Sequence, residues 1–265
     1  MLTLRRTVRF AVNPGDDGST PPAGDNGYAG VPALRGLGRY YELDIACRGR
    51  ASAVTGYFMD IKTIDRAARA TIIPAITRAV HENPAAEPAA VLAACLAPLN
   101  AALGGSLDTV AFRLSPYYSV EMSAAHPDRV LVRQRFELAA AHRLNVPSLS
   151  PEENRQIFGR CNHPSGHGHN YIVEPAVRLP AAAARPDFLT ELERVVKREI
   201  LDPYDHTHFN IDTAEFREGS GLNPSVENIA KVFFERLKPA VAPLGGELAA
   251  ITVWETEKTS ATYPA

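Results

Sequence analysis

Hydrophobic residues recur along the chain with two different periods, and the two halves of the chain repeat the same order of patterns. Alternation of apolar and polar residues, typical of a half-buried strand, covers residues 7–12, 38–48, 130–142 and 167–179. Apolar residues spaced three and four apart, typical of one helical face, cover 61–72, 88–103, 188–200 and 225–241. Each half closes with strands within 109–122 or 250–263, for which a hairpin is expected although the pattern does not set its division, so the order in each half is β-β-α-α-β-β.

The repeated order extends to the residues themselves. Residues 36–43 align with residues 166–173 at an offset of 130, and residues 72–74 align with 201–203 at an offset of 129. This near-constant spacing predicts a tandem of two α+β units, residues 1–125 and residues 130–265. We expect each unit to be an antiparallel four-stranded sheet with two helices on one face.

Metal-ligating side chains are concentrated in the second half, where six of the eight histidines fall between positions 142 and 208. His167 and His169 are two residues apart on a predicted strand, so their side chains point to one face of the sheet. Two imidazoles on one face can bind one transition-metal ion. A catalytic zinc site takes three protein ligands and leaves one position open.

His142 is the candidate for the third ligand. It ends the predicted strand 130–142 and shares a face with the apolar Leu138 and Ala140. A single histidine on an apolar face is usually a core residue. If this strand lies next to strand 167–179, however, three imidazoles converge, and convergence favours a metal centre. His208 is a fourth candidate on spacing alone, which would make the zinc structural.

Cys161 lies in a polar loop just before the histidine pair. A free cysteine is usually buried and inert, but a nearby cation lowers the pKa of a thiol and makes it a base or a nucleophile. The aligned positions of the first half hold Val31, Leu37 and Arg39. We therefore predict that the first half has no metal or catalytic residues.

Three acidic or basic side chains elsewhere in the second half are further candidates. Asp205 and His206 are adjacent in a loop, and a carboxylate that orients an imidazole can form a proton relay. Glu255 shares a strand face with Ile251 and Val253, where a carboxylate needs a partner. That partner could be an arginine, or the paired N–H groups of a ligand such as a pterin or guanine.

Ser225 and Glu227 stand at the beginning of the predicted helix 225–241. Ser225 suits the N-cap position, and Glu227 suits the positive end of the helix dipole. Capping alone would account for both residues, and contact with a bound ligand is the functional alternative.

Composition narrows the function classes. The chain has 265 residues and a formal net charge of −2, which predicts no nucleic-acid partner and no anionic membrane surface. No apolar run approaches the roughly 18 residues of a membrane span, and the N-terminus lacks the apolar core of a secretion signal. Three cysteines far apart argue against a disulfide framework and favour a reducing, cytoplasmic location.

With these residues assembled, the second half resembles the 6-pyruvoyl tetrahydropterin synthase family from Phe136 to about Tyr263. The matching segments are 148–154, 158–162, 166–171, 201–210 and 254–256. The five residues between Cys161 and His167 are typical of the pyruvoyl-type branch. Pro203 and Tyr204, just before Asp205, depart from the family pattern.

The resemblance implies the T-fold (tunnelling fold), in which antiparallel sheets of several subunits close into a barrel. It implies 7,8-dihydroneopterin triphosphate as the substrate and a lyase reaction that eliminates triphosphate, for which Mg²⁺ is a candidate companion. It implies one zinc ion per chain, bound by His142, His167 and His169. Cys161 would be the base that transfers a proton, and Asp205 and His206 would be a second acid/base pair. Glu255 would anchor the pterin.

Two alternatives stay open at this point. The second half also resembles the 6-carboxytetrahydropterin synthases of the queuosine and deazapurine pathway. Those enzymes use the same substrate but also release acetaldehyde, so they are carbon–carbon lyases. The alternative from another functional class is a non-catalytic protein that binds zinc or a pterin. The presence of Cys161, Asp205, His206 and Glu255 together argues against this alternative. For assembly, the family usually forms a hexamer of units, so a tandem chain predicts a homotrimer that acts as a pseudo-hexamer.

Overall fold

The computed structural model describes residues 1–19, 22, 24–185 and 187–265, and it divides into two compact units. Unit 1 comprises Met1–Val132 and Leu179–Pro186, and unit 2 comprises Arg133–Arg178 and Asp187–Ala265. The candidate metal ligands and catalytic side chains, from His142 to Glu255, all belong to unit 2.

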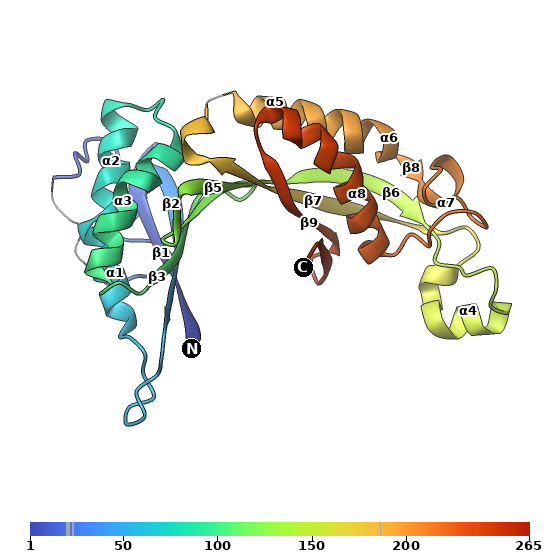
Figure 1. The fold of residues 1–265 in the computed structure, drawn as a ribbon, viewed down its shortest axis with the longest axis horizontal. Helices are drawn as coiled ribbons and strands as arrows, with labels where there is room; N and C mark the ends of the chain where they lie inside the picture. The colour runs from blue at the N-terminus through green and yellow to red at the C-terminus, as the bar shows by residue number, and fades with distance from the viewer. Residues whose placement is uncertain (20–21, 23, 186) are drawn as a thin grey trace. The chain divides into compact units, whose positions relative to one another are not determined.

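Unit 1 is an antiparallel sheet with helices on one face (Figure 1). Its strands are β1 (Leu2–Val12), β2 (Arg39–Gly49), β3 (Leu107–Ser115), β4 (Tyr118–Ser123) and β5 (His126–Gln134). Its helices are α1 (Ile61–Ala70), α2 (Ile72–Glu82), α3 (Pro88–Ala102) and the short η2 (Ala181–Ala183). Strand β1 pairs with β2 along its whole length, and the covered face buries Phe10, Leu43 and Ile45.

Unit 2 has strands in the order β8–β6–β7–β9–β10, in which the β6–β8 pair is parallel and the others are antiparallel. These strands are β6 (Phe136–His142), β7 (His167–Pro180), β8 (Thr207–His208), β9 (Glu247–Thr256) and β10 (Thr259–Tyr263). The helices are α4 (Pro151–Phe158), α5 (Phe188–Val196), α6 (Asp202–Tyr204), α7 (Phe209–Asp212) and α8 (Val226–Val241). Short helical turns are η1 (Gly159–Asn162), η3 (Lys197–Leu201) and η4 (Ala242–Leu244).

Helix α8 shows how the sequence pattern makes the core of unit 2. The Ser225 hydroxyl accepts a hydrogen bond from the Asn228 amide, so the predicted N-cap is confirmed. Ile229, Phe233 and Leu237 follow at helical spacing and are fully buried. Together with α5, the helix covers one face of β7 and β9 (Figure 1).

The predicted α+β class agrees with the structure, but the prediction of four strands per unit is wrong, because the sheet has ten strands. The predicted strand 130–142 is divided at Arg135 into β5 and β6. The closing strands of each half do form a hairpin, as expected, with two-residue turns at 116–117 and 257–258. The two-residue strand β8 was not predicted.

The structure bears on membrane association in one respect. Among the helices formed by the described residues, none combines the length and the apolar character needed to cross a bilayer.

Phe233 offers a test of the unit 2 core. Its side chain is fully buried and its ring lies 4.9 Å from that of Tyr204. We expect Phe233→Ala to lower the free energy of unfolding by about 3–5 kcal/mol, because it leaves a cavity in a packed core. Urea unfolding followed by the fluorescence of Trp254, the one tryptophan of the chain, measures this change. As a control, Lys231→Ala at an exposed position of the same helix should change the free energy of unfolding little. Equal stability of the two variants would contradict the role of Phe233 in the core.

Candidate metal centre and active site

The site is built on the pairing of β6 with β7. The strands are antiparallel neighbours, as predicted, and their register sets His142 opposite His167 and Ala140 opposite His169. Because side chains alternate along a strand, all three imidazoles project from one face of the sheet.

The three imidazoles converge. One ring nitrogen from each of His142, His167 and His169 lies within 4.8 Å of the others, which is a spacing that one metal ion can bridge. The Nε2 atoms of His142 and His167 are 3.3 Å apart. Within the described ranges of the chain, this cluster of three histidines is the group of side chains that could hold a metal.

His142 is oriented by a backbone carbonyl. Its Nδ1 lies 2.7 Å from the Pro224 carbonyl oxygen, which can only accept, so Nδ1 carries the proton and Nε2 has a free lone pair. Burial lowers the pKa of His142 to about 4; the Pro224 hydrogen bond opposes this shift, and the neighbouring imidazoles add to it. At neutral pH the ring is therefore uncharged, the form that binds metals.

The other two imidazoles carry buried nitrogens without partners. Among the described residues, no group accepts from or donates to His167 Nδ1 or His169 Nε2. Burial lowers the pKa of His169, against the opposing charge of Glu255. Such atoms are costly to leave unpaired, and for His169 Nε2 a metal ion would remove the cost. The donor set, three imidazoles, fits an open zinc site.

Glu255 lies beside this cluster. Its Oε1 is 3.4 Å from His142 Nε2 and 3.6 Å from His169 Nε2. Among the described residues, no arginine pairs with the Glu255 carboxylate. The carboxylate thus faces the imidazoles, at a place where it could contact either a metal or a ligand bound to it.

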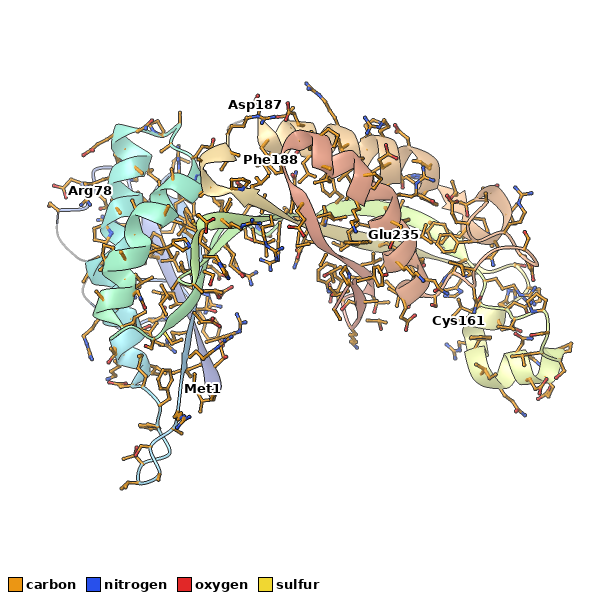
Figure 2. All side chains as sticks on the ribbon, viewed as in Figure 1. Met1, Arg78, Cys161, Asp187, Phe188 and Glu235 are labelled. Carbon is orange, nitrogen blue, oxygen red and sulfur yellow. The ribbon has the colours of Figure 1, made fainter. Side chains whose placement is uncertain are left out.

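Cys161 lies in η1, the short turn that follows α4 (Figure 2). Its backbone carbonyl accepts a hydrogen bond from the Leu144 amide, two residues beyond His142. Burial raises the pKa of the Cys161 thiol, and the negative charge of Glu255 raises it further. Without a cation nearby the thiol is therefore protonated at neutral pH.

Asp205 and His206 form the predicted pair at the edge of β6. Asp205 Oδ2 lies 2.9 Å from His206 Nδ1, and Asp205 Oδ1 accepts from the Ala139 amide. Burial alone would raise the pKa of Asp205, but these hydrogen bonds outweigh it and the pKa is lowered. His206 has a positive φ of 58°, and its side chain is 82% exposed. The pair is formed, but it is not part of the converging histidine cluster.

The remaining sequence candidates have structural positions of their own. His208 does not join the three converging imidazoles; its backbone amide donates to Asp212. Ser225 caps α8, and Glu227 is an exposed residue of the first turn. Since Ser225 directly follows Pro224, the start of α8 is tied to His142.

Two residues of the site were missed by sequence reasoning. Pro224 acts through its carbonyl group, which any residue would offer, so the sequence holds no signal for it. Tyr171 is fully buried, its ring packs beside those of His142 and His169, and within the described structure its hydroxyl has no partner. Its position two residues beyond His169 on one strand face was a usable signal.

Comparison with known proteins shows similarity over the second half of the chain. The family model described as "6-pyruvoyl tetrahydropterin synthase" matches residues 131–265. The 6-pyruvoyl tetrahydrobiopterin synthase of Homo sapiens is 34% identical over 134 residues, 50% of this chain and 89% of that protein. That of Dictyostelium discoideum is 29% identical over 139 residues, 51% of this chain and 95% of that protein.

Among solved structures, the 6-pyruvoyl tetrahydropterin synthase of Caenorhabditis elegans is 31% identical, with a TM-score of 0.47. The similarity covers 52% of this chain and 96% of that one.

The stability of the metal-free protein should depend on pH through His142. An unfolded imidazole has a pKa of about 6.5, and burial holds that of His142 at about 4, so the unfolded state takes up a proton first as pH falls. The contribution is complete above pH 6.5 and is lost towards pH 4, about 3 kcal/mol in all.

Urea unfolding of the metal-free protein at a series of pH values measures this loss. His142→Asn should flatten the dependence over that range. His126→Asn, at an exposed position of β5, should keep it. A His142→Asn variant with the original pH dependence would contradict the assignment.

Proposed function

The chain belongs to the 6-pyruvoyl tetrahydropterin synthase family, and from this premise we propose that it is a zinc-dependent synthase acting on 7,8-dihydroneopterin triphosphate. The reaction eliminates triphosphate and yields 6-pyruvoyl tetrahydropterin. The observation that carries the proposal is the convergence of three imidazoles beside Glu255. Three nitrogen donors leave a zinc ion one open position for a substrate.

The histidines would hold the ion, and each has a reason to bind it. His142 is neutral and directed by Pro224, and His169 has a buried nitrogen without a partner in the described structure. When bound, zinc supplies a Lewis acid that polarises substrate hydroxyls and makes the adjacent C–H bonds more acidic.

Cys161 is the proposed base that removes a proton from the substrate carbon. Its thiol pKa is raised in the metal-free protein by burial and by Glu255, so its thiolate form depends on a compensating positive charge nearby. Asp205 and His206 are proposed as the second acid/base pair: the carboxylate fixes the orientation of the imidazole, which is exposed and free to exchange protons.

Glu255 is the proposed anchor of the pterin ring. Its carboxylate can accept two N–H groups of an amidine-like edge, and its place beside His142 would hold the pterin next to the metal. Ser225 and Glu227 are proposed as further substrate contacts, because the Pro224–His142 hydrogen bond ties the start of α8 to the site.

We further propose that the chain is a tandem of T-fold units, with residues 1–125 as a degenerate unit and 130–265 as the catalytic one. Three chains would then supply six units, as a homotrimer with three active sites, and Mg²⁺ would accompany the substrate triphosphate. Light scattering tests the assembly: a monomer, of 28.7 kDa, would contradict it.

Metal content tests the ligand set. We expect one zinc ion per chain by elemental analysis. His167→Ala should lower the content close to zero, because two remaining imidazoles bind zinc weakly. His126→Ala, at an exposed position outside the cluster, should keep the full content. Two zinc ions per chain, or unchanged zinc in His167→Ala, would refute the site.

Product analysis tests the function. Zinc-loaded protein incubated with 7,8-dihydroneopterin triphosphate should release triphosphate and the pyruvoyl product, identified by mass spectrometry. Release of acetaldehyde would instead indicate the carboxy-type synthase, and no conversion would indicate a binding protein. Cys161→Ala should keep its zinc and lose roughly 10²- to 10⁴-fold in turnover. Loss of zinc in that variant would make the thiol a ligand rather than a base.

A further inference from the structure

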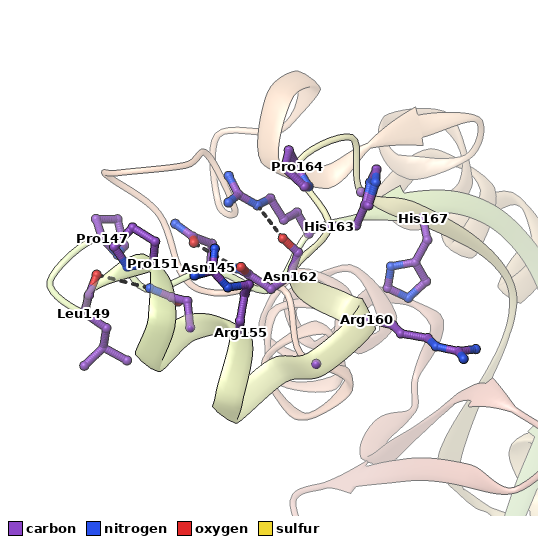
Figure 3. Close-up of a pocket in the computed structure, with 14 residues that line it drawn as sticks. Asn145, Pro147, Leu149, Pro151, Arg155, Arg160, Asn162, His163, Pro164 and His167 are labelled. Carbon is purple, nitrogen blue, oxygen red and sulfur yellow. Dashed lines mark hydrogen bonds between the residues drawn. The ribbon is translucent and has the colours of Figure 1, made fainter.

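A cavity of about 750 Å³ lies next to the histidine cluster, on the side of α4. His167 stands at one side of it, and Pro147 and Leu149 line the other (Figure 3). His167 is thus shared between the cavity and the converging imidazoles.

The side chains around the cavity carry positive charge. Three arginines in its lining supply this charge, namely Arg143, Arg155 and Arg160. Of the described residues that line it, none has a carboxylate. A concave surface with this charge concentrates anions.

The three arginines differ in whether a carboxylate already pairs with them. Arg143 pairs with Glu218 at 3.0 Å, and Arg155 pairs with Glu152 on the surface of α4. Arg160 is exposed, and no side chain in the described part of the chain pairs with it. Its side chain extends below the ring of His167 (Figure 3), so its guanidinium is the group most available to a ligand.

The walls of the cavity are held by buried amides. Asn154 is 2% exposed, and its side chain bonds both the amide and the carbonyl of Val146. Asn162 is 6% exposed and donates to the Leu144 carbonyl and to Asn145. The loop and η1 are therefore fixed before a ligand binds, which lowers the entropy cost of binding.

We infer that this cavity binds the triphosphate chain of the substrate, with Arg160 as the principal contact and Arg143 and Arg155 adding positive charge. The inference rests on the proposed function, because a triphosphate ester whose hydroxyls bind at the histidine cluster must extend its anionic end into adjacent space. Guanidinium groups match phosphate oxygens with paired, charge-assisted hydrogen bonds.

Calorimetric titration of the zinc-loaded full chain with inorganic triphosphate tests the site directly. Arg160→Gln should weaken triphosphate binding about tenfold or more, the typical loss for a hydrogen bond between charged groups. Arg194→Gln makes the same charge change at an exposed position of α5 and should leave binding unchanged. Equal affinities of Arg160→Gln and the unaltered protein would overturn the inference.

A second probe separates the triphosphate subsite from the pterin subsite. Binding of neopterin, which carries no phosphate, should be the same in Arg160→Gln and in the unaltered protein. An equal loss for neopterin and triphosphate would show that Arg160 does not act on phosphate and would also overturn the inference.

Kinetics distinguish failure of the site from failure of the function. If the protein converts its substrate and Arg160→Gln leaves KM unchanged, the triphosphate site is wrong and the proposed function stands. If it converts no pterin but binds triphosphate through Arg160, the proposed function is wrong and the anion site stands, with a different phosphorylated ligand.

Discussion

The opposition of His142 and His167 across β6 and β7 is the constraint on which the site depends. A shift of one residue in this register would send His167 and His169 to the other face and leave His142 alone in the core. Gly166 permits the approach: it has a φ of +66°, and a Cβ there would lie 2.7 Å from the His142 carbonyl oxygen. The strand can therefore begin at His167 only because a glycine precedes it.

Buried polar atoms without hydrogen-bond partners on the same face of the sheet lower the stability of the fold. His167 Nδ1, His169 Nε2 and the Tyr171 hydroxyl are buried, and the described residues provide them with no partner. Each unpaired group costs about 1–3 kcal/mol. Neighbouring positions such as Leu138 and Val173 are apolar and carry no such cost. A concentration of unsatisfied polar atoms in an otherwise well-packed sheet is typical of a site whose ligand completes it.

Much of this site could be predicted because it follows from strand periodicity. His167 and His169 are two positions apart, and His142 shares a face with Leu138, so the sequence alone predicts the face of the sheet to which each side chain points. The strand count could not be derived, because the break at Arg135 lies within a continuous strand-like pattern and the two-residue strand β8 is too short to leave one.

Other features depend on tertiary contacts that leave no local pattern. The sequence shows that Glu255 needs a partner, but only the packing of β9 against β7 identifies two imidazoles beside it. The Pro224 carbonyl and the arginine-lined cavity are set by loops that come together from positions far apart in the chain.

The two aligned strand pairs surround their central tyrosine with different side chains. Tyr41 on β2 lies opposite Phe10, as Tyr171 on β7 lies opposite Leu138. The Tyr41 ring packs against Phe10 and Phe112, with centroids 5.7 and 5.0 Å away, whereas the Tyr171 ring faces two imidazoles. Unit 1 thus fills this region with aromatic contacts.

The residues of the first half that align with His167 and His169 complete this contrast. Leu37 aligns with His167 and is 97% exposed, and Arg39 aligns with His169 at the first residue of β2. Neither can act as a neutral nitrogen donor. Among the described residues of unit 1, no buried imidazole is left unpaired, and the buried side-chain nitrogens without a partner are those of Arg69, Nε and Nη2. On the aligned strands, unit 2 therefore concentrates unpaired ring nitrogens and the Tyr171 hydroxyl on one sheet face, where the described residues of unit 1 pack aromatic rings instead.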